Sequence, residues 1–132
     1  MYVRRRKRRV KKKRGGIYES TKMKKQFRYR SSWELAYMKY LDLADEIESY
    51  DYEFIRIPYI SNKKSGKIRN YIPDFLICYV SGNKQIVEIK PSSRVANIKN
   101  RKKFAAATIY CSQNNLEFII LTEVELKKMK LL

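Results

Sequence analysis

The chain contains no histidine among its 132 residues. Histidine is the general base of Ser-His-Asp and Cys-His catalysis and a common nitrogen ligand of metals in proteins. Its absence excludes these nucleophilic mechanisms, and it also excludes nucleases that hold a metal through imidazole. Chemistry at a site of this chain therefore has to use other side chains.

Cysteine is almost as scarce, and long apolar runs are missing. Cys78 and Cys111 lie in apolar contexts without metal-ligand spacing, so we expect reduced core residues rather than a disulfide. No stretch approaches the roughly 20 apolar residues needed to span a bilayer. The basic N-terminus has no apolar segment behind it and does not resemble a secretory signal. We therefore expect no membrane association.

Carboxylates are also in short supply, since 13 Asp and Glu face 31 Lys and Arg and leave a formal net charge of +18. The imbalance lies mostly in residues 1–30, where fifteen basic residues face only Glu19. Residues 31–132 carry sixteen basic and twelve acidic residues. The sequence predicts a basic arm over residues 1–26, disordered until it meets an anion, and one folded domain over residues 27–132. Ile17–Lys25 is expected to be an irregular lead-in to that domain.

A positive charge of this size favours polyanions, and nucleic acid is the usual one. An anionic membrane surface fits less well, because residues 1–14 have no apolar face to insert. We predict that the arm binds phosphates and that basic residues of the domain extend the same track: Arg4, Arg5, Arg6, Lys7, Arg8, Arg9, Arg28, Arg30, Arg69, Arg94, Lys99 and Lys102. The alternative is that half of these side chains are only solvated surface charges.

Apolar periodicity predicts an α/β (α+β) domain in the order helix, three strands, helix, strand, helix. Ser31 and Glu34 have the spacing of a capping box, and an apolar stripe then continues to Ile47, which predicts the first helix. The later elements are strands over 53–60, 70–80 and 84–90, a polar turn over 62–67, a helix over 97–114, a strand over 116–121 and a capped helix from Thr122.

The helix over 97–114 connects two predicted strands, so that strand, helix and strand form a crossover unit. Ile98, Ala105 and Ile109 are expected on its inward face, with Ala106 and Tyr110 as further candidates, and its lysines and arginines are expected largely outside. The sheet is therefore expected to be mixed.

The pair of apolar strands over 70–80 and 84–90 carries three charges in sequence that otherwise looks buried: Asp74, Glu88 and Lys90. Charges are rarely left in a core without partners, because desolvating them is costly. Glu88 and Lys90 point to one face of their strand, and a hairpin can bring Asp74 close to Glu88. Two such carboxylates can hold Mg²⁺ between them, and Lys90 can then position a water or neutralise a phosphate.

Each of these residues also has a plainer interpretation. Glu34, which can supply a further carboxylate from the first helix, can instead be only the capping partner of Ser31. Glu88 and Lys90 can be an exposed strand face or an ion pair, and Asp74 after a proline can be a turn residue. The combination of all three in apolar surroundings favours a site.

The sequence resembles the PD-(D/E)XK nucleases, since Pro73-Asp74 is followed by Glu88-Ile89-Lys90. Within that superfamily it is similar to the head completion nucleases of tailed phages and to the TnsA-type transposon endonucleases. The resemblance covers residues 27–126 and rests on five separated blocks: Tyr29–Glu34, Ile57–Tyr59, Gly66–Tyr71, Glu88–Pro91 and Ile119–Glu123. Tyr50 departs from the pattern, where a tryptophan is expected, and this affects packing only.

The resemblance implies a restriction-endonuclease-like mixed sheet flanked by helices, and Mg²⁺-dependent (or Mn²⁺-dependent) hydrolysis of DNA phosphodiester bonds. Asp74, Glu88 and Glu34 are implied as metal ligands, and Lys90 as the catalytic lysine. DNA is the implied partner, with phage head or portal proteins or a transposase complex beside it, and no small-molecule substrate is expected. Together with the absence of an export signal, the resemblance indicates a location in a virion or in the host cytoplasm.

Several functions stay open at this point. The first is an endonuclease for phage head completion or DNA-end processing, with the arm as a tether to phosphates. A Holliday-junction resolvase and a transposon end-cleaving endonuclease would use the same catalytic group. The last alternative is a non-catalytic nucleic-acid-binding virion protein whose carboxylates are relics.

Overall fold

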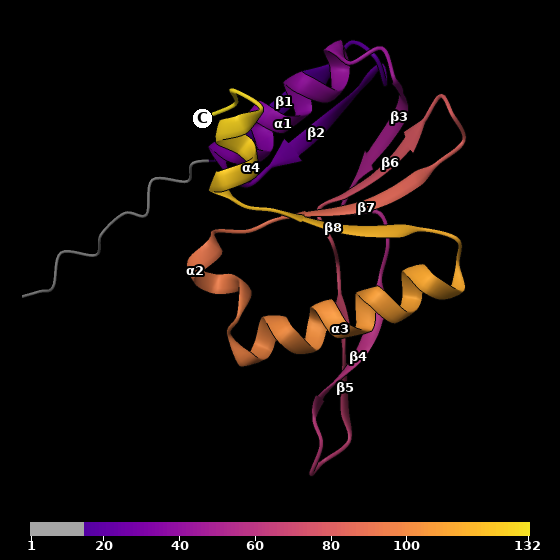
Figure 1. Ribbon diagram of the computed structural model, residues 1–132, viewed down its shortest axis with the longest axis vertical. Coiled ribbons are helices and arrows are strands. Elements are labelled where there is room, and N and C mark those ends of the chain that lie inside the picture. The colour runs from indigo at the N-terminus through magenta and orange to yellow at the C-terminus, as the bar shows by residue number, and fades with distance from the viewer. Residues whose placement is uncertain (1–14) are drawn as a thin grey trace, which may run out of the picture.

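The computed structural model describes residues 15–132, so residues 4–9, predicted to bind phosphates, lie outside the described part of the chain. Figure 1 shows the elements, which follow in the order β1 (Gly16–Ser20), β2 (Lys25–Tyr29), α1 (Ser32–Leu43), β3 (Ile47–Tyr52), β4 (Ile57–Asn62), β5 (Lys67–Tyr71), β6 (Phe75–Tyr79), β7 (Lys84–Ile89), α2 (Ser92–Val95), α3 (Ile98–Gln113), β8 (Glu117–Leu121) and α4 (Glu123–Lys128).

A four-stranded mixed sheet in the order β3-β6-β7-β8 forms the centre of the domain (Figure 1). β6 is antiparallel to both β3 and β7, whereas β8 runs parallel to β7. The chain passes through α3 between β7 and β8, because parallel neighbours need a crossover connection. The predicted α/β (α+β) class, a mixed sheet flanked by helices, is confirmed.

The two faces of this sheet carry separate layers and separate cores. On one face, α1, α4 and the β1–β2 hairpin surround a core that includes the fully buried Met38 and Leu41. On the other face, α3 and the β4–β5 strand pair enclose a smaller core around Phe104. Successive side chains of β7 point to opposite faces of the sheet. Ile86 therefore packs in the smaller core and its neighbour Val87 in the larger one.

Helix α1 begins as predicted and ends earlier than predicted. The Ser31 hydroxyl accepts a hydrogen bond from the Glu34 backbone N–H at 3.2 Å, so the predicted N-cap is confirmed. The Glu34 carboxylate does not complete a capping box, because it accepts the N–H of Arg30 instead, at 3.0 Å. The predicted extension to Ile47 is wrong, since the helix stops at Leu43 and Ile47 starts β3.

The irregular lead-in predicted over 17–25 is wrong, because most of this segment forms the antiparallel β1–β2 hairpin. The hairpin is fixed to α1 through the carboxylate of Asp42, which accepts the hydroxyl of Tyr18 at 2.5 Å and that of Ser20 at 2.7 Å. The predicted boundary between residues 26 and 27 falls inside β2. Short polar strands of this kind give little apolar alternation to read.

Two of the predicted strands are divided differently in the structure. Only the second half of the strand expected over 53–60 forms a strand, since β4 runs from Ile57 to Asn62. Glu53, with a φ of 51°, lies in the break between β3 and β4. The strand expected over 70–80 is two strands, since β5 pairs with β4 and β6 pairs with β3 and β7. The break falls at Ile72–Asp74, where Pro73 has no N–H to donate.

Helix α3 lies where it was predicted, but its inward face was predicted only in part, since Ala106 and Tyr110 pack against the smaller core. The buried side chains are Asn100, Phe104, Ala107 and Cys111, a stripe at helical spacing, whereas Ile98 and Ile109 are exposed. The capping box predicted at Thr122 is confirmed at the start of α4. No helix within residues 15–132 has the length and apolar character required to cross a membrane. Both cysteines are free, as predicted.

Candidate active site

The predicted carboxylates Asp74 and Glu88 are neighbours at one end of the β6–β7 pair. Asp74 directly precedes β6, and the register that opposes Phe75 to Val87 brings it beside Glu88. The backbone N–H of Asp74 donates to Glu88 Oε1 at 3.3 Å, and that of Ile89 donates to Asp74 Oδ2 at 2.8 Å. The strand pairing thus fixes both side chains through main-chain donors.

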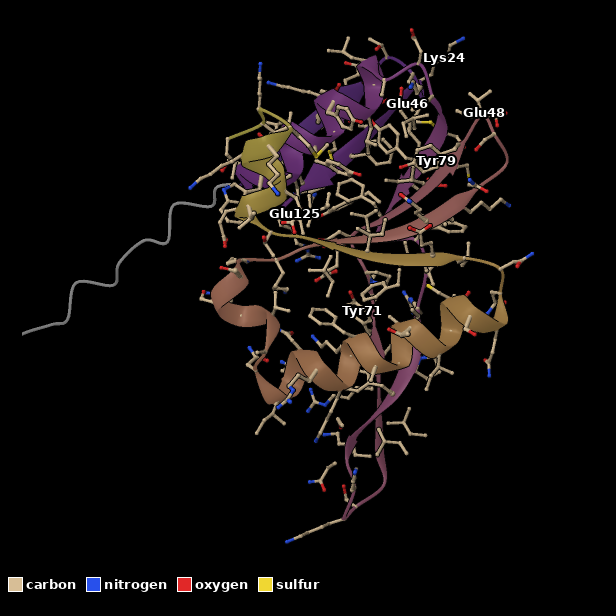
Figure 2. All side chains as sticks on the ribbon, viewed as in Figure 1. Lys24, Glu46, Glu48, Tyr71, Tyr79 and Glu125 are labelled. Atoms are coloured by element: carbon tan, nitrogen blue, oxygen red, sulfur yellow. The ribbon has the colours of Figure 1, made fainter. Side chains whose placement is uncertain are left out.

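Glu88 is only 4% exposed and is held from two further sides. The Tyr71 hydroxyl donates to its Oε1 at 2.8 Å, and Lys90 Nζ lies 3.4 Å from its Oε2. Glu88 and Lys90 share one face of the chain, as strand alternation predicted. Figure 2 shows Tyr71 on the side of the sheet that faces α3. The lysine and the tyrosine therefore approach Glu88 from the smaller core.

Glu34 reaches the same region from the other face of the sheet. It is buried in the first turn of α1, where its carboxylate accepts the Tyr52 hydroxyl and the Arg30 N–H. Its charge is near enough to contribute to the raised pKa of Asp74. The structure therefore joins Asp74, Glu88 and Lys90 through direct contacts. Glu34 lies near Asp74, but its own hydrogen bonds go to Arg30 and Tyr52.

The electrostatics of the carboxylate pair are unfavourable to two negative charges. Burial, together with the charges of Glu88 and Glu34, raises the pKa of Asp74 to about 8. Burial also raises the pKa of Glu88, and the hydrogen bond from Tyr71 and the charge of Lys90 only partly oppose this. The fold thus holds two carboxylates where full ionisation of both is disfavoured. Such perturbed groups are typical of functional sites.

A divalent cation fits the chemistry of Asp74 and Glu88 better than that of all three carboxylates. Carboxylate oxygens are the ligands Mg²⁺ prefers, and a cation between them would relieve the disfavoured charges. Within residues 15–132, no three carboxylate or cysteine side chains are grouped closely enough to hold a metal ion. Glu34 is engaged by Tyr52 and Arg30.

Three residues of the site were missed at the level of sequence: Tyr52, Tyr71 and Lys103. Burial and the nearby carboxylates raise the pKa of both tyrosines, so both hydroxyls stay protonated donors. Burial, with Lys99 and Lys90 nearby, lowers the pKa of Lys103, whose Nζ lies 5.8 Å from the centroid of the Tyr71 ring. Both tyrosines fit the apolar pattern of a strand, which predicts core residues. Nothing in the sequence indicates that their hydroxyl groups reach the carboxylates.

The predicted phosphate-binding residues of the domain fall into separate groups. Arg28 and Arg30 lie on or beside β2 and line a cavity of about 880 Å³, where Arg30 forms an ion pair with Glu53 at 2.5 Å. Arg94 is exposed on α2. The remaining three line a different cavity, between the β4–β5 pair and α3: Arg69, Lys99 and Lys102.

A mixed sheet that presents paired acidic residues and a lysine at one strand end fits the nuclease class, and comparison with known proteins agrees with this class. The family model described as "TnsA-like endonuclease N terminal" matches residues 44–123, which is more than half of the chain. The chain belongs to this family. Asp74, Glu88 and Lys90 lie inside the matched range, and Glu34 lies outside it.

The chain is also similar to a curated protein, the head completion nuclease of Enterobacteria phage T4. The two are 39% identical over 67 residues, which is 51% of this chain and 44% of that protein. The matched part therefore spans less than half the length of the relative. The resemblance to the PD-(D/E)XK nucleases that the sequence motifs indicated is confirmed.

Proposed function

We propose that this protein is a metal-dependent DNA endonuclease that hydrolyses phosphodiester bonds, with Mg²⁺ or Mn²⁺ as its cofactor. The observation that carries the proposal is the pair of fixed carboxylates, Asp74 and Glu88, with Lys90 Nζ 3.4 Å from Glu88. Membership of the TnsA-like endonuclease family and the similarity to a phage nuclease support it.

In this proposal Asp74 and Glu88 hold the cation. Glu34 is not a ligand and acts on Asp74 through its negative charge. A bound Mg²⁺ would supply a more acidic coordinated water and stabilise charge on the phosphate. The main-chain donors and Tyr71 keep the two carboxylates oriented. Lys90 acts on the substrate side, where its ammonium group orients the attacking water or neutralises a phosphate oxygen.

The biological setting is proposed along the two lines that the comparisons suggest. Similarity to a head completion nuclease favours processing of DNA ends at the phage head, with head or portal proteins as partners. Membership of the TnsA-like family favours cleavage at transposon ends within a transposase complex. The first is our principal proposal, because it rests on direct sequence identity to one protein rather than on a family profile.

Incubation of the protein with supercoiled plasmid and Mg²⁺ tests the activity. We expect nicked and linear products from the native protein, and none when EDTA is present or when Asp74 is replaced in Asp74→Ala. Glu48→Ala is the matched control, because Glu48 is exposed and lies well away from Tyr71 in Figure 2. It should cleave at the native rate.

Cleavage that survives EDTA or Asp74→Ala would contradict the assignment of the site. Absence of cleavage with any divalent metal would instead favour a non-catalytic DNA-binding protein. A strong preference for four-way junctions over linear duplex would favour a resolvase. Each outcome is read on the same gel with the same protein preparation.

A further inference from the structure

The side of the molecule that carries α3 and the β4–β5 pair has basic residues without carboxylates among them. Residues 54–73 contain five Lys and Arg and no Asp or Glu, and residues 91–116 contain five more and again no Asp or Glu. Such a surface repels itself unless an anion covers it, and it raises the local concentration of polyanions. This charge pattern is independent of the carboxylates at the active site.

The β4–β5 pair is a two-stranded ribbon that packs on α3 at its base. It is hydrogen-bonded as its own antiparallel sheet, and it extends past α3 with its turn pointing away from the central sheet (Figure 1). The turn is held by local contacts, because the Asn62 side chain accepts the N–H of Lys64 at 2.9 Å and Gly66 supplies a φ of +69°. The turn presents the exposed Lys63 and Lys64 at its tip.

A cavity of about 550 Å³ is lined by residues of both the ribbon and α3. Lys67 and Arg69 line it from the ribbon, and Lys99 and Lys102 line it from the helix. Lys102 Nζ donates to the carbonyl oxygen of Ser61 at 3.0 Å, which ties the two walls together. Four cationic side chains around one cavity match a chain of phosphates better than a single small anion.

The opposite face of the ribbon carries an exposed apolar pair. Ile60 and Ile68 oppose each other across the two strands, and they are 55% and 65% exposed. A partner with both charge and apolar surface would cover these isoleucines together with the basic residues of the ribbon. The edges of bases, including the methyl group of thymine, offer such surface in a DNA groove beside the charged backbone.

We propose that the β4–β5 ribbon enters the major groove of duplex DNA, while one phosphate strand of that groove passes through the cavity between the ribbon and α3. A two-stranded ribbon fits the roughly 12 Å width of the major groove. The ribbon also ends at the active site, since Tyr71, its last residue, donates to Glu88 at 2.8 Å. This inference deepens the proposed function, on which it rests for its substrate, by specifying duplex DNA.

The first test is equilibrium binding of a fluorescent duplex to the full-length protein without divalent metal, over a range of salt concentrations. The variant Lys63→Ala/Lys64→Ala/Lys67→Ala removes ribbon charge. The control, Lys39→Ala/Lys84→Ala/Lys128→Ala, removes three exposed lysines from other elements. Each lysine–phosphate contact that is lost should lower the magnitude of the salt slope by about 0.9 and the affinity by on the order of tenfold at 0.1 M salt. Loss of all three contacts would therefore lower the slope by about 2.7.

We expect the ribbon variant to lose more affinity for duplex than for single-stranded DNA of the same length, and to lose more than the control. Equal losses in the two triple variants would overturn the proposal, because the ribbon would then be ordinary surface charge. Equal losses on duplex and single strand would also overturn it. Circular dichroism on both variants checks that the exposed substitutions leave the fold intact.

The second test addresses the groove. Ile60→Ser/Ile68→Ser should weaken duplex binding about tenfold without changing the salt slope, since no charge is removed. Methylation of guanine N7, which lies in the major groove, should be reduced by the native protein and restored in this variant. Unchanged affinity, or protection only of adenine N3 in the minor groove, would overturn major-groove insertion.

These tests separate the inference from the proposed function, because they are made without metal. If the native protein cleaves plasmid but the ribbon variants bind duplex normally, the proposed role of the ribbon is wrong and the endonuclease proposal stands. A native protein that binds duplex through the ribbon but does not cleave with any metal would overturn the endonuclease and leave the ribbon in place.

Discussion

The two sides of the central sheet differ in how their charges are balanced. Residues 15–53, which form the hairpin, α1 and β3, carry eight acidic and six basic residues. The ribbon and α3 side carries ten basic residues in residues 54–73 and 91–116 and no acidic one. The first side balances its charges within the fold. The second side has no acidic residue in these ranges to pair with its basic ones. Asp74 and Glu88 lie at one end of the β6–β7 pair, in the central sheet that separates the two sides.

Asp42 and Asp74 differ in whether their surroundings favour the charged carboxylate. Burial would raise the pKa of Asp42, but hydrogen bonds from Tyr18, Ser20 and Tyr50 outweigh it, so the pKa is lowered. Asp74, in contrast, has its pKa raised to about 8 by burial and by neighbouring carboxylates. The same side chain therefore stabilises the fold at one position and opposes it at the other. Residues kept against stability are expected at functional sites.

The largest effect should follow from Glu88→Gln, which keeps the size of the side chain and removes its charge. We expect single-turnover nicking to fall by about 10²–10³-fold, in the range found when one electrostatic group of an active site is lost. The free energy of unfolding should not fall, because a disfavoured buried charge is removed. Activity within tenfold of the native value, measured with the same folded fraction, would contradict the assigned role of Glu88.

Asp42→Ala should have the largest effect on stability and a small effect on chemistry. It leaves the hydroxyls of Tyr18, Ser20 and Tyr50 without their acceptor, so we expect the free energy of unfolding to fall by about 2–4 kcal/mol in urea titrations. Asp45→Ala, at an exposed position in the turn that follows α1, is the control. A comparable loss in both variants would mean that the network does not fix the hairpin to α1.

The pH dependence of stability should separate the two aspartates. Because the folded pKa of Asp74 is raised above its unfolded value, the folded state keeps a proton that the unfolded chain releases, so stability falls as pH rises from about 4 to about 8. For Asp42 the pKa is lowered, so its contribution is present above the unfolded pKa and is lost as pH falls through the folded one.

Metal-free urea unfolding of Asp74→Asn and the native protein at several pH values measures this. The variant should be more stable at pH 8, by on the order of several kcal/mol at about 1.4 kcal/mol per pKa unit, and the difference should shrink toward pH 4. A variant that is less stable than the native protein throughout this range would show that Asp74 is a structural acceptor, as Asp42 is.

The smallest effect is expected at the surface ion pair between Lys25 and Asp51, 2.5 Å apart and partly exposed. Exposed pairs contribute little because solvent and salt screen them. Lys25→Ala should lower the free energy of unfolding by less than about 1 kcal/mol, and less still at high salt. A loss as large as that of Asp42→Ala would mean that the hairpin side depends on surface charge rather than on its buried network.

The sequence allowed prediction of Asp74, Glu88 and Lys90 as a group because strand alternation and the hairpin between them are local features. Glu34 was found through its capping spacing, which places it at a rigid helix start. Its true main-chain donor, Arg30, was not predicted, since the capping box pattern points to Ser31. The site was therefore predictable where local periodicity and short-range pairing determine it.

The elements that were missed depend on contacts distant in sequence. β1 and β2 are short polar strands that gain their stability from Asp42 in α1, more than 20 residues away. In α3, the isoleucines suggested an inward face, whereas the helix buries Asn100, whose amide donates to the Arg94 carbonyl at 2.8 Å. A polar residue satisfied by tertiary contacts cannot be recognised as buried from hydrophobicity alone.

The most direct test of the central claim, that Asp74 and Glu88 are held together as a cation site, is thermal unfolding as a function of Mg²⁺ concentration. A cation that binds only the folded state raises the melting temperature with concentration. We predict a rise for the native protein and for Glu48→Gln, and none for Asp74→Asn. An equal rise in all three proteins, or no rise in any of them, would contradict the account.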